Sequence, residues 1–527
     1  MERESETGHP RRWAILAALV VSLLIVVLDN TVLNVALRVL ADPTQGLGTT
    51  QAQLEWAINA YTLVFAGLLF TCGVLGDRWG RRGVLLGGLA LFGLASLASA
   101  YAQSPGQLIA ARAVMGIGAA AVTPVTLSII SNVFDPRERG RAIGVWASAV
   151  GIASALGPVL GGALLEHFWW GSVFLINVPI VAGGLVAVAV LVPESRDPRR
   201  GRIDLVGVAL SIAGLVALVY GIIDGGEHGF ARPSVWAWIG LGLAVLAGFL
   251  AYERRLVHPS LDVTLFADPR FSAATAAIAL IFFASIGMLF FLSLHLQLVH
   301  GLTPLQTGLL MLPLAAAQLF FAPRSAALVK RYGAKAVCAT GLALSAAAIS
   351  GVLLLGTTAP VWLLGVVLFL HGAGMANVVP PATESTMSAV PREKAGVASA
   401  VSNTVRQVAA ALGVAVLGSV VAATYRDRVT GSLASLPAPA RPVAAESISG
   451  AHAVAGDLGA AGAPLVAAAN DAFVTGVHTA TVLAASAAVL GAIVVLAWLP
   501  GHGARPAPPV PIAAAATGND PAEPPRG

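Results

Sequence analysis

The chain has very little charge. Only 11% of its 527 residues are Asp, Glu, Lys or Arg, whereas 57% are hydrophobic. A soluble globular protein carries about 25% charged residues. So few charges cannot cover a water-facing surface, which excludes a soluble globular protein and makes lipid the expected solvent.

Cysteine is also scarce, and the common signatures of enzyme sites are missing. Cys72 and Cys338 fall in or beside apolar stretches, so they provide neither a disulfide framework nor metal-ligand spacing. The sequence contains no Gly-x-x-x-x-Gly-Lys-Ser/Thr phosphate-binding loop, no zinc signature and no credible hydrolase nucleophile elbow. We therefore expect no metal, no cofactor and no enzymatic activity. Any uphill transport would have to draw on an ion gradient, here the proton gradient.

What the chain does have is long apolar stretches. A helix needs about 20 apolar residues to cross a bilayer. The pair 204–223 and 234–252 gives the weakest signal, and a re-entrant pair is the alternative there. The prediction is an all-α membrane protein with 14 transmembrane helices, at 13–37, 54–75, 83–101, 107–130, 142–163, 171–192, 204–223, 234–252, 272–299, 304–323, 336–355, 361–386, 396–423 and 473–499.

The basic residues favour one side of the membrane. With the amino terminus and the loops after even-numbered spans placed inside, those segments and the carboxyl tail hold 24 of the 31 Lys and Arg, and the opposite loops hold five. Lys and Arg are retained on the cytoplasmic side during insertion. We expect a multi-pass protein of the cell inner (plasma) membrane with both termini cytoplasmic. The net charge of +5 then reflects topology and requires no nucleic acid. The apolar run after Arg12 has no convincing cleavage site, so a retained first helix is expected.

A faint internal repeat divides the chain. Residues 77–82 read Asp-Arg-Trp-Gly-Arg-Arg, and residues 330–335 read Lys-Arg-Tyr-Gly-Ala-Lys, eight spans later. Many transporters are built from such repeats, with the substrate site between them. The expected organisation is a cytoplasmic N-terminus (1–12), a six-helix half (13–203), a two-helix insert (204–253), a second six-helix half (254–500) with a long external loop (424–472), and a disordered Pro-rich cytoplasmic tail (501–527).

Two ionisable residues within spans are the first candidates for function, because such groups are costly in a bilayer and usually mark ion or substrate paths. Asp29 lies in the first span with Asn30 and Asn34, at a spacing that can line one side of a helix. Arg112 lies in the fourth span and stays charged at any working pH, so it needs a carboxylate or carbonyl partner. The alternatives are an interfacial Asp29 and a snorkelling Arg112 near the external end. We favour a role in a cavity for both.

Other polar residues are less decisive. Glu384 either binds a proton or lies at the cytoplasmic interface, and Arg406 either takes part in coupling or pairs structurally across helices. His295 and His371 can titrate near neutral pH, but a hydrogen-bonded packing role fits equally well. A solvated loop is expected for the cluster at the external end of the seventh span: Asp224, Glu227 and His228.

The fifth span is rich in small residues. Gly157 and Gly161 have the Gly-x-x-x-Gly spacing that lets helix backbones approach closely, and Pro158 removes a backbone donor and bends the helix. This composition suits a helix that repacks as a cavity changes access; static packing is the alternative. The motif comprises Gly151, Gly157, Pro158, Gly161 and Gly162.

Together these segments resemble a known family. Residues 73–82, Gly-Val-Leu-Gly-Asp-Arg-Trp-Gly-Arg-Arg, resemble motif A of the major facilitator superfamily, and the Gly157-Pro158 segment resembles motif C of its antiporters. Residues 28–37 resemble the first-helix motif of the 14-helix drug:proton antiporters, the EmrB/QacA subfamily. The resemblance covers 13–423 and 473–499 and implies a role for Arg112, which matches the motif B arginine, in proton coupling.

The resemblance also implies a cytoplasmic gate. We expect Asp77 near the start of a helix, where an anion is favoured, and Arg78 paired across the interface between the halves. Asn59 stands where some relatives carry Asp, which argues against dicationic substrates, and Lys330 replaces the acid of the second motif copy. The expected gate residues are Gly73, Asp77, Arg78, Gly80, Arg81 and Arg82.

The expected function is a proton-coupled antiporter that exports lipophilic drugs or antibiotics across the cytoplasmic membrane by alternating access, with protons and membrane lipid as its other partners. A periplasmic adaptor has no support in the sequence. The alternatives are a narrow-specificity metabolite exporter or importer of the same superfamily, with motif C opposing import, and a non-transporting membrane sensor, which the short loops oppose. The expected coupling residues are Asp29, Asn34, Arg112, Glu384 and Arg406.

Overall fold

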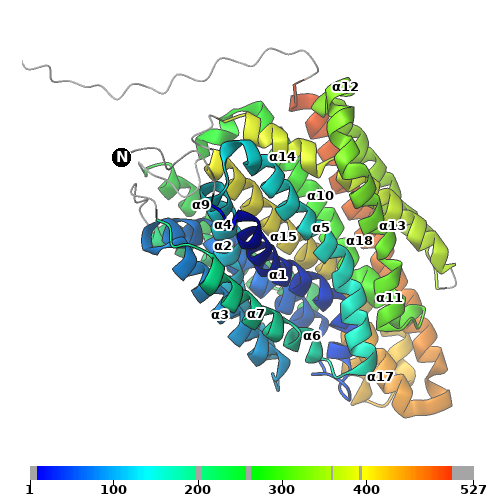
Figure 1. Cartoon of the computed structure of the whole chain (residues 1–527). Helices are drawn as coiled ribbons and strands as arrows, with labels where there is room; N and C mark the ends of the chain where they lie inside the picture. The colour runs from blue at the N-terminus through cyan, green and yellow to red at the C-terminus, as the bar shows by residue number, and fades with distance from the viewer. Residues whose placement is uncertain (1–8, 197–203, 257–262, 358–359, 391–394, 501–527) are drawn as a thin grey trace, which may run out of the picture.

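The computed structural model describes residues 9–196, 204–256, 263–357, 360–390 and 395–500. Throughout these ranges the regular structure is helical, and long helices run side by side as a bundle (Figure 1). The predicted all-α architecture is therefore confirmed. The first eight residues and the Pro-rich tail lie outside the described ranges, so the expectation of a disordered tail is not addressed.

The helices up to residue 253 fall within the segments expected to form the first half and the insert. The expected insert consists of α8 (Leu205–His228) and α9 (Pro233–Glu253). The helices of the first half are α1 (Arg12–Ala41), α2 (Gln51–Trp79), α3 (Arg81–Ala100), α4 (Pro105–Val133), α5 (Pro136–His167), α6 (Ser172–Leu175) and α7 (Asn177–Leu191).

The second half is more irregular, with several breaks in its long helices. Its elements are η1 (Val263–Ala267), α10 (Pro269–Leu294), the π-helical η2 (His295–Val299), α11 (Pro304–Leu310), α12 (Leu312–Ser350), η3 (Gly351–Leu354), α13 (Val361–Ala376), α14 (Val379–Ser388), α15 (Ala395–Val429), η5 (Thr430–Ser435), α16 (Ala440–Glu446), α17 (Ile448–Leu458), η6 (Gly459–Gly462) and α18 (Ala463–Trp498).

Eleven helical stretches in the described residues are long and apolar enough to cross a membrane, or up to twelve if the bent α2 is counted as one span. The chain is thus a multi-pass membrane protein. Both α8 and α9 are among the eleven, so each is long enough to be a separate span. Two of the stretches, 304–354 and 448–498, are each 51 residues long.

The two copies of the sequence repeat share a backbone feature. Gly80, with φ of 118°, joins α2 to α3, and Gly333, with φ of 83°, forms a kink inside α12. Positive φ is a conformation that residues with a Cβ rarely adopt. The aromatic-Gly pair seen in the sequence therefore marks the same kind of helix junction in both places.

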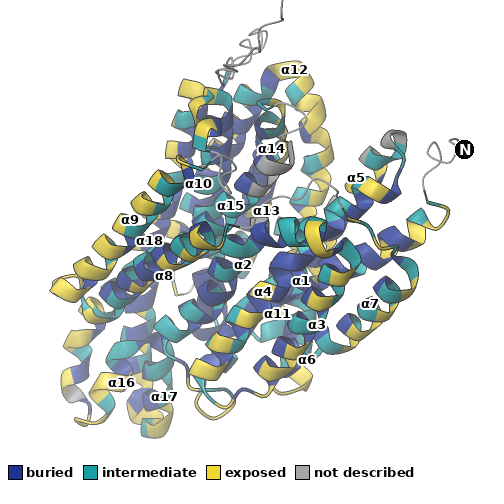
Figure 2. Ribbon diagram, turned by 90° about the vertical axis from the view of Figure 1, so that its left-hand side faces the viewer, coloured by how far each residue is buried: buried dark blue, intermediate teal, exposed yellow. Residues whose placement is uncertain are grey.

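The first insert helix covers the seam between the two halves. Its residues Leu215, Val219 and Ile223 form a buried apolar cluster with Leu63 of α2 and Ala415 of α15. The second insert helix, α9, is mostly exposed along its length (Figure 2), as a helix facing lipid would be. The insert therefore has an inner helix and an outer helix.

The two ends of the bundle can be told apart by the chain termini. We call the end near residue 9, where the His9 N–H donates to the Val133 carbonyl at 3.0 Å, the terminal end, and the opposite end the far end. Residues 424–472, expected to form a loop at the far end, are mostly helical: α15 continues to Val429, and α16, α17 and the start of α18 follow (Figure 1). Ile448, Ala451 and Val454 are buried there. The Ala- and Gly-rich composition of this segment suggested a loop, although its apolar residues recur at helical spacing.

Candidate proton-coupling site

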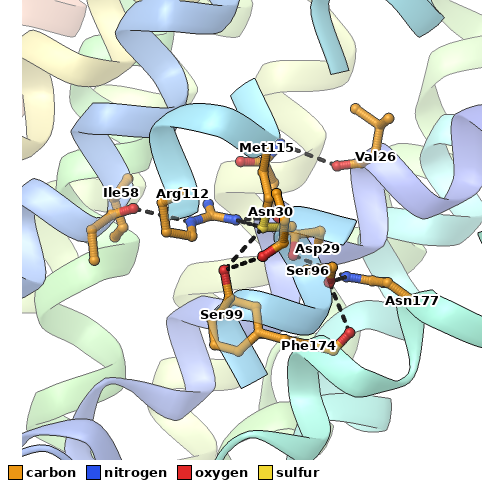
Figure 3. A network of polar contacts seen from close by, with 12 residues as sticks. Val26, Asp29, Asn30, Ile58, Ser96, Ser99, Arg112, Met115, Phe174 and Asn177 are labelled. Atoms are coloured by element: carbon orange, nitrogen blue, oxygen red, sulfur yellow. Dashed lines mark hydrogen bonds and ion pairs between the residues drawn. The ribbon is translucent and has the colours of Figure 1, made fainter. Parts of the chain in front are cut away.

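Asp29 of α1 and Arg112 of α4 form an ion pair in the interior of the first half (Figure 3). Only 2% of Asp29 and 1% of Arg112 is exposed. An Nη1 donor of Arg112 contacts Oδ2 of Asp29, and Nε donates to the Ala57 carbonyl on α2 at 3.1 Å. The arginine is therefore held at two points, by a carboxylate and by a backbone carbonyl.

The second carboxylate oxygen of Asp29 has its own donor. Asn177, the first residue of α7, donates from Nδ2 to Asp29 Oδ1 at 3.1 Å. The same amide nitrogen lies 3.1 Å from Ser96 Oγ on α3, and that hydroxyl donates to the Phe174 carbonyl at 2.8 Å. Figure 3 shows these side chains converging from separate helices. The break between α6 and α7 places Asn177 at the start of a helix, where its side chain reaches the carboxylate.

Helix α2 contributes an aromatic ring to the pair and also carries a buried amide on another face. The Arg112 guanidinium carbon lies 4.4 Å from the centre of the Tyr61 ring, a cation–π contact. Asn59 is fully buried, and among the described residues neither of its amide atoms has a hydrogen-bond partner. Asn59 lies on a different face of α2 from Ala57 and Tyr61, so its amide is available to a ligand or to water elsewhere in the interior.

The chemistry available at this pair follows from its burial. An unpaired buried charge is strongly unfavourable, whereas a paired and hydrogen-bonded one is tolerated. A proton bound by Asp29 would remove the charge that holds Arg112, so proton binding and the α1–α4 contact are linked. Five helices of one half, α1, α2, α3, α4 and α7, meet at this point.

The other expected coupling residues lie apart from the pair. The Asn34 amide donates to the Asn30 carbonyl of its own helix at 3.2 Å. Glu384 is exposed on α14, in the second half. Arg406 of α15 lies with its guanidinium carbon 5.2 Å from the Phe282 ring centre. The structure thus brings together Asp29 and Arg112 of the expected set, and it gives the other three different surroundings.

The intramembrane histidines also differ from each other. His371 Nε2 lies 2.9 Å from Ser285 Oγ, which fits the packing interpretation. His295 is buried in the π-helical turn, and neither ring nitrogen has a partner among the described residues. Its ring centre lies 5.0 Å from that of His300.

The sequence model of the Major Facilitator Superfamily matches residues 19–414. The chain belongs to this superfamily. Its relatives include the multidrug efflux pump LfrA of Mycolicibacterium smegmatis, with 40% identity covering 93% of this chain and 97% of the relative. They also include the tetracenomycin C resistance and export protein of Streptomyces glaucescens, with 32% identity, 79% of this chain and 77% of the relative.

The fold comparison agrees with the sequence match. A bacterial homologue of the human lysosomal transporter Spinster, solved in an inward-facing and occupied conformation, aligns with a TM-score of 0.65 at 18% identity. The alignment covers 93% of this chain and 97% of that one. At this identity the likeness supports the major facilitator fold, and the site is argued from the chain's own residues.

The residues expected to form a gate lie at the terminal end and bond within the first half. Asp77 Oδ1 accepts from Arg81 Nε at 2.9 Å and lies 2.8 Å from Arg81 Nη2, while Arg78 is exposed. The expectation that Arg78 pairs across the halves is therefore wrong for this conformation. Asp77 also lies in the last turn of α2, not at the start of a helix, because α3 begins only at Arg81. Ser128 of α4 adds a long hydrogen bond of 3.5 Å to Asp77.

The remaining gate residues pack around the loop that follows α7. Gly80 adjoins the Glu194 carboxylate so closely that a Cβ there would lie 2.6 Å from Oε1. The Arg82 guanidinium donates to the Ala189 carbonyl, and its backbone N–H donates to Glu194 Oε1 at 3.3 Å. Gly73 adjoins Pro124, with 3.6 Å to its Cβ. The gate segment is thus anchored to α4 and to the end of α7.

The small residues of α5 provide close contacts on two sides. A Cβ at Gly157 would lie 1.8 Å from Thr31 Oγ1 on α1, and one at Gly161 would lie 2.9 Å from a Val32 methyl. At Gly162 it would lie 2.5 Å from the Leu305 Cα of α11 in the second half. Pro158 is buried inside the helix, and the surroundings of Gly151 lie outside the described residues. The expectation of a closely packed helix is confirmed.

Contacts between the halves close the far end. Arg38 near the end of α1 donates to the Gln297 carbonyl at 2.7 Å, and the Gln297 amide donates to the Val35 carbonyl at 3.0 Å. On the other side, Gln51 at the start of α2 donates to the Gly418 carbonyl of α15 at 3.3 Å. At the terminal end, by contrast, the named gate residues bond within their own half.

Sequence reasoning missed several residues of these sites. Asn177 binds Asp29, Ser96 binds Asn177, and Glu194 binds the backbone of Arg82, but none of the three belongs to a motif that stood out. For Asn177 and Ser96 the signal in the sequence is a polar residue within an apolar span. Glu55 is a further acidic residue that the sequence analysis does not single out, and only 2% of it is exposed.

Proposed function

We propose that the chain is a proton-coupled antiporter that exports lipophilic drugs or antibiotics by alternating access. The observation that carries the proposal is the buried Asp29–Arg112 pair inside one half of a major facilitator fold. The relatives support export as its direction, because their names describe efflux or export of drugs and antibiotics. A methyl viologen resistance protein of Salmonella typhimurium is 34% identical over 79% of this chain and 83% of that relative, and its name describes resistance.

The pair supplies the coupling step. Protons arriving from outside bind Asp29 and displace Arg112 from its Oδ2, while Arg112 keeps the Ala57 carbonyl and the Tyr61 ring as partners. Asn177 stays available to the Asp29 carboxyl through its amide. Loss of the ionic contact loosens α1 from α4, so the protonated and deprotonated forms favour different packing of the first half. The protein carries substrate outward while Asp29 is deprotonated, after Asp29 has released its proton to the inside.

The proton gradient is strong enough for this role. At 100 mV, one proton moving inward supplies about 2.3 kcal/mol, and each pH unit adds about 1.4 kcal/mol. Together these terms sustain a gradient of several hundredfold for a neutral solute exchanged against one proton.

We also propose fourteen spans, with the terminal end in the cytoplasm. The stretch 304–354 would be about 77 Å long as one helix at 1.5 Å per residue, far more than the roughly 30 Å of the hydrocarbon core. Added to the twelve spans counted with α2, the division of this stretch at Gly333 gives one more and α5 gives another, which makes fourteen. The strong bias of Lys and Arg toward the terminal end supports the orientation. The two six-helix halves and the insert are then the units of this topology, and the closed far end is external.

Dye efflux tests the function. Cells that express the chain are loaded with ethidium, a lipophilic cation, and its loss is followed by fluorescence with and without a protonophore. Efflux above the vector control that the protonophore abolishes is expected. Efflux that persists at the same rate with the protonophore would contradict proton coupling. If ethidium stays in the cells, efflux of neutral and anionic antibiotics is measured in the same way, and no protonophore-sensitive loss of any of them would contradict the proposal.

A further inference from the structure

A second group of ionisable side chains lies at the far end, away from the Asp29–Arg112 pair. Residues of α2, α8, α15 and α16 surround a small cavity with room for about one water molecule. The polar members of its lining are Thr50, Gln51, Glu55, Glu227, Ser419, Arg426 and Glu446. The cavity lies on the seam between the halves, where the insert helix α8 covers it.

Glu55 is the deepest of these groups. Its Oε1 accepts from Gln51 Nε2 at 3.3 Å, and its buried Oε2 has no partner among the described residues. The carboxyl group packs against Gly418 of α15, where a Cβ would lie only 2.2 Å from Oε1. The carboxyl of one half thus occupies a space that a glycine of the other half leaves free.

The charged groups that face this cavity are mostly acidic. From α8 comes Glu227. Outside the lining, on the same helix, Asp224 Oδ1 lies 2.9 Å from His228 Nδ1. From α15 comes Arg426, whose Nη2 donates to the Gly226 carbonyl at 2.9 Å. From α16 comes Glu446, whose pKa is raised by burial and by repulsion from Glu227, against the opposing effect of Arg426.

The packing therefore has one arginine among several carboxyl groups, and that arginine is directed to a backbone carbonyl. Burying an ionised carboxylate with an unpaired oxygen costs several kcal/mol. The contact of Glu55 with Gly418 is compatible with a neutral carboxyl group. When the far end opens, α2 and α15 separate there, water reaches the carboxyl group, and the cost of ionisation falls.

We propose that Glu55 is a second proton-binding residue, which takes its proton from the outside and must hold it for the external end to close. The proposal rests on the orientation and function proposed above. Asp29 gives up its proton inward, whereas Glu55 lies behind the closed external end, so its proton returns to the side from which it came. Glu55 therefore controls closure without adding to the number of protons transported per cycle. An external end that closes only after proton uptake would prevent an empty, unprotonated return.

Distances between spin labels across the external end test this proposal. Labels are attached at Gln45→Cys, in the exposed loop after α1, and Arg428→Cys, at the exposed end of α15, with the buried Cys72 and Cys338 replaced by serine. The protein also carries Asp29→Asn, which removes the first titrating carboxylate. The parent, Glu55→Gln and Glu166→Gln are compared in lipid nanodiscs between pH 5 and pH 8. Glu166 is an exposed carboxylate at the same end, on α5, and serves as the matched control.

The expected result is a parent whose external end is closed at pH 5 and opens as the pH rises. Glu55→Gln, which is nearly isosteric and permanently neutral, should stay closed at every pH, and Glu166→Gln should follow the parent. Gly418→Ala, which crowds the carboxyl group, should lower the closed population even at pH 5. A parent without a pH response, or a Glu55→Gln protein that keeps the parent's response, would overturn the proposal. The measurement needs no substrate, so its failure is separate from failure of dye efflux.

Discussion

Asp29 and Arg112 stand 83 positions apart in the sequence and form an ion pair that is almost completely shielded from water. Because neither charge is tolerated alone in such a place, the protonation of one residue determines the position of the other. The pair lies within one half, so it acts on the packing of α1 against α4. Rearrangement between the halves must then follow from that change in packing.

Replacing the carboxylate should stop coupling and spare the fold. Asp29→Asn keeps the shape of the side chain and an acceptor for Asn177, but it cannot take up a proton. Protonophore-sensitive ethidium efflux is expected to fall to the vector level, with membrane abundance unchanged. Asp42→Asn is the matched control, because Asp42 follows α1 and bonds to Thr44 in the loop at the far end. Normal efflux by Asp29→Asn would exclude Asp29 as the coupling residue.

The stability of the purified protein should reveal the energy of the pair. Arg112→Gln leaves a buried carboxylate without its cation, and breaking a buried pair in this way costs about 3–5 kcal/mol. The double variant Asp29→Asn and Arg112→Gln removes both charges and should recover most of that loss. Thermal unfolding in detergent at neutral pH measures the stability of the single and of the double variant. If the double variant loses as much stability as the two single variants lose together, the two residues do not interact.

The apolar stretches predicted the helical fold well, because hydropathy reports burial in lipid directly. The candidate pair was also predictable, since an arginine inside a span needs an anion and Asp29 was the available one. Their partners were not predictable. Asn177 reaches Asp29 because α7 begins at that residue; Pro179 indicates a helix start nearby, but nothing in the sequence indicates which distant carboxylate the amide meets.

The predictions that the structure contradicts concern the connections between helices. Asp77 was placed at a helix start, but α2 continues through Trp79, and Gly80 alone makes the turn to α3. The segment 424–472 was expected to be a loop because Gly, Ala, Ser and Pro are common in it, yet Tyr425 Oη donates to the Ala444 carbonyl at 2.9 Å and ties α16 to α15. Composition describes average environment and does not report such specific tertiary bonds.

A methyl group at Gly157 should weaken the protein and its transport. The added Cβ of Gly157→Ala would overlap Thr31 Oγ1, so α5 and α1 must move apart. We expect a loss of stability of about 1–3 kcal/mol, typical of overpacking, and reduced dye efflux. Gly240→Ala on α9 is the control, since nothing lies within 4 Å of a Cβ there. Thr31→Ala combined with Gly157→Ala should recover part of the loss, because it removes the nearest atom.

The gate offers a test of which arginine pairs with Asp77. The single change Asp77→Arg places like charges together beside Arg81 and should reduce efflux strongly. Adding Arg81→Asp restores an opposite pair at the same spacing. The swap also suits both helices, because it puts a cation in the last turn of α2 and an anion in the first turn of α3. We therefore expect this double variant to regain a substantial part of the efflux.

The matched control exchanges Asp77 with its neighbour instead, through Asp77→Arg and Arg78→Asp. Since Arg78 is exposed and Arg81 holds the Asp77 carboxylate, this double variant should remain as defective as Asp77→Arg alone. The stability changes should be below about 1 kcal/mol, because the pair is partly exposed. Efflux rates at equal membrane abundance therefore provide the readout. Rescue by the Arg78 swap, and none by the Arg81 swap, would mean that Arg78 is the functional partner and that the Asp77–Arg81 contact is incidental to transport.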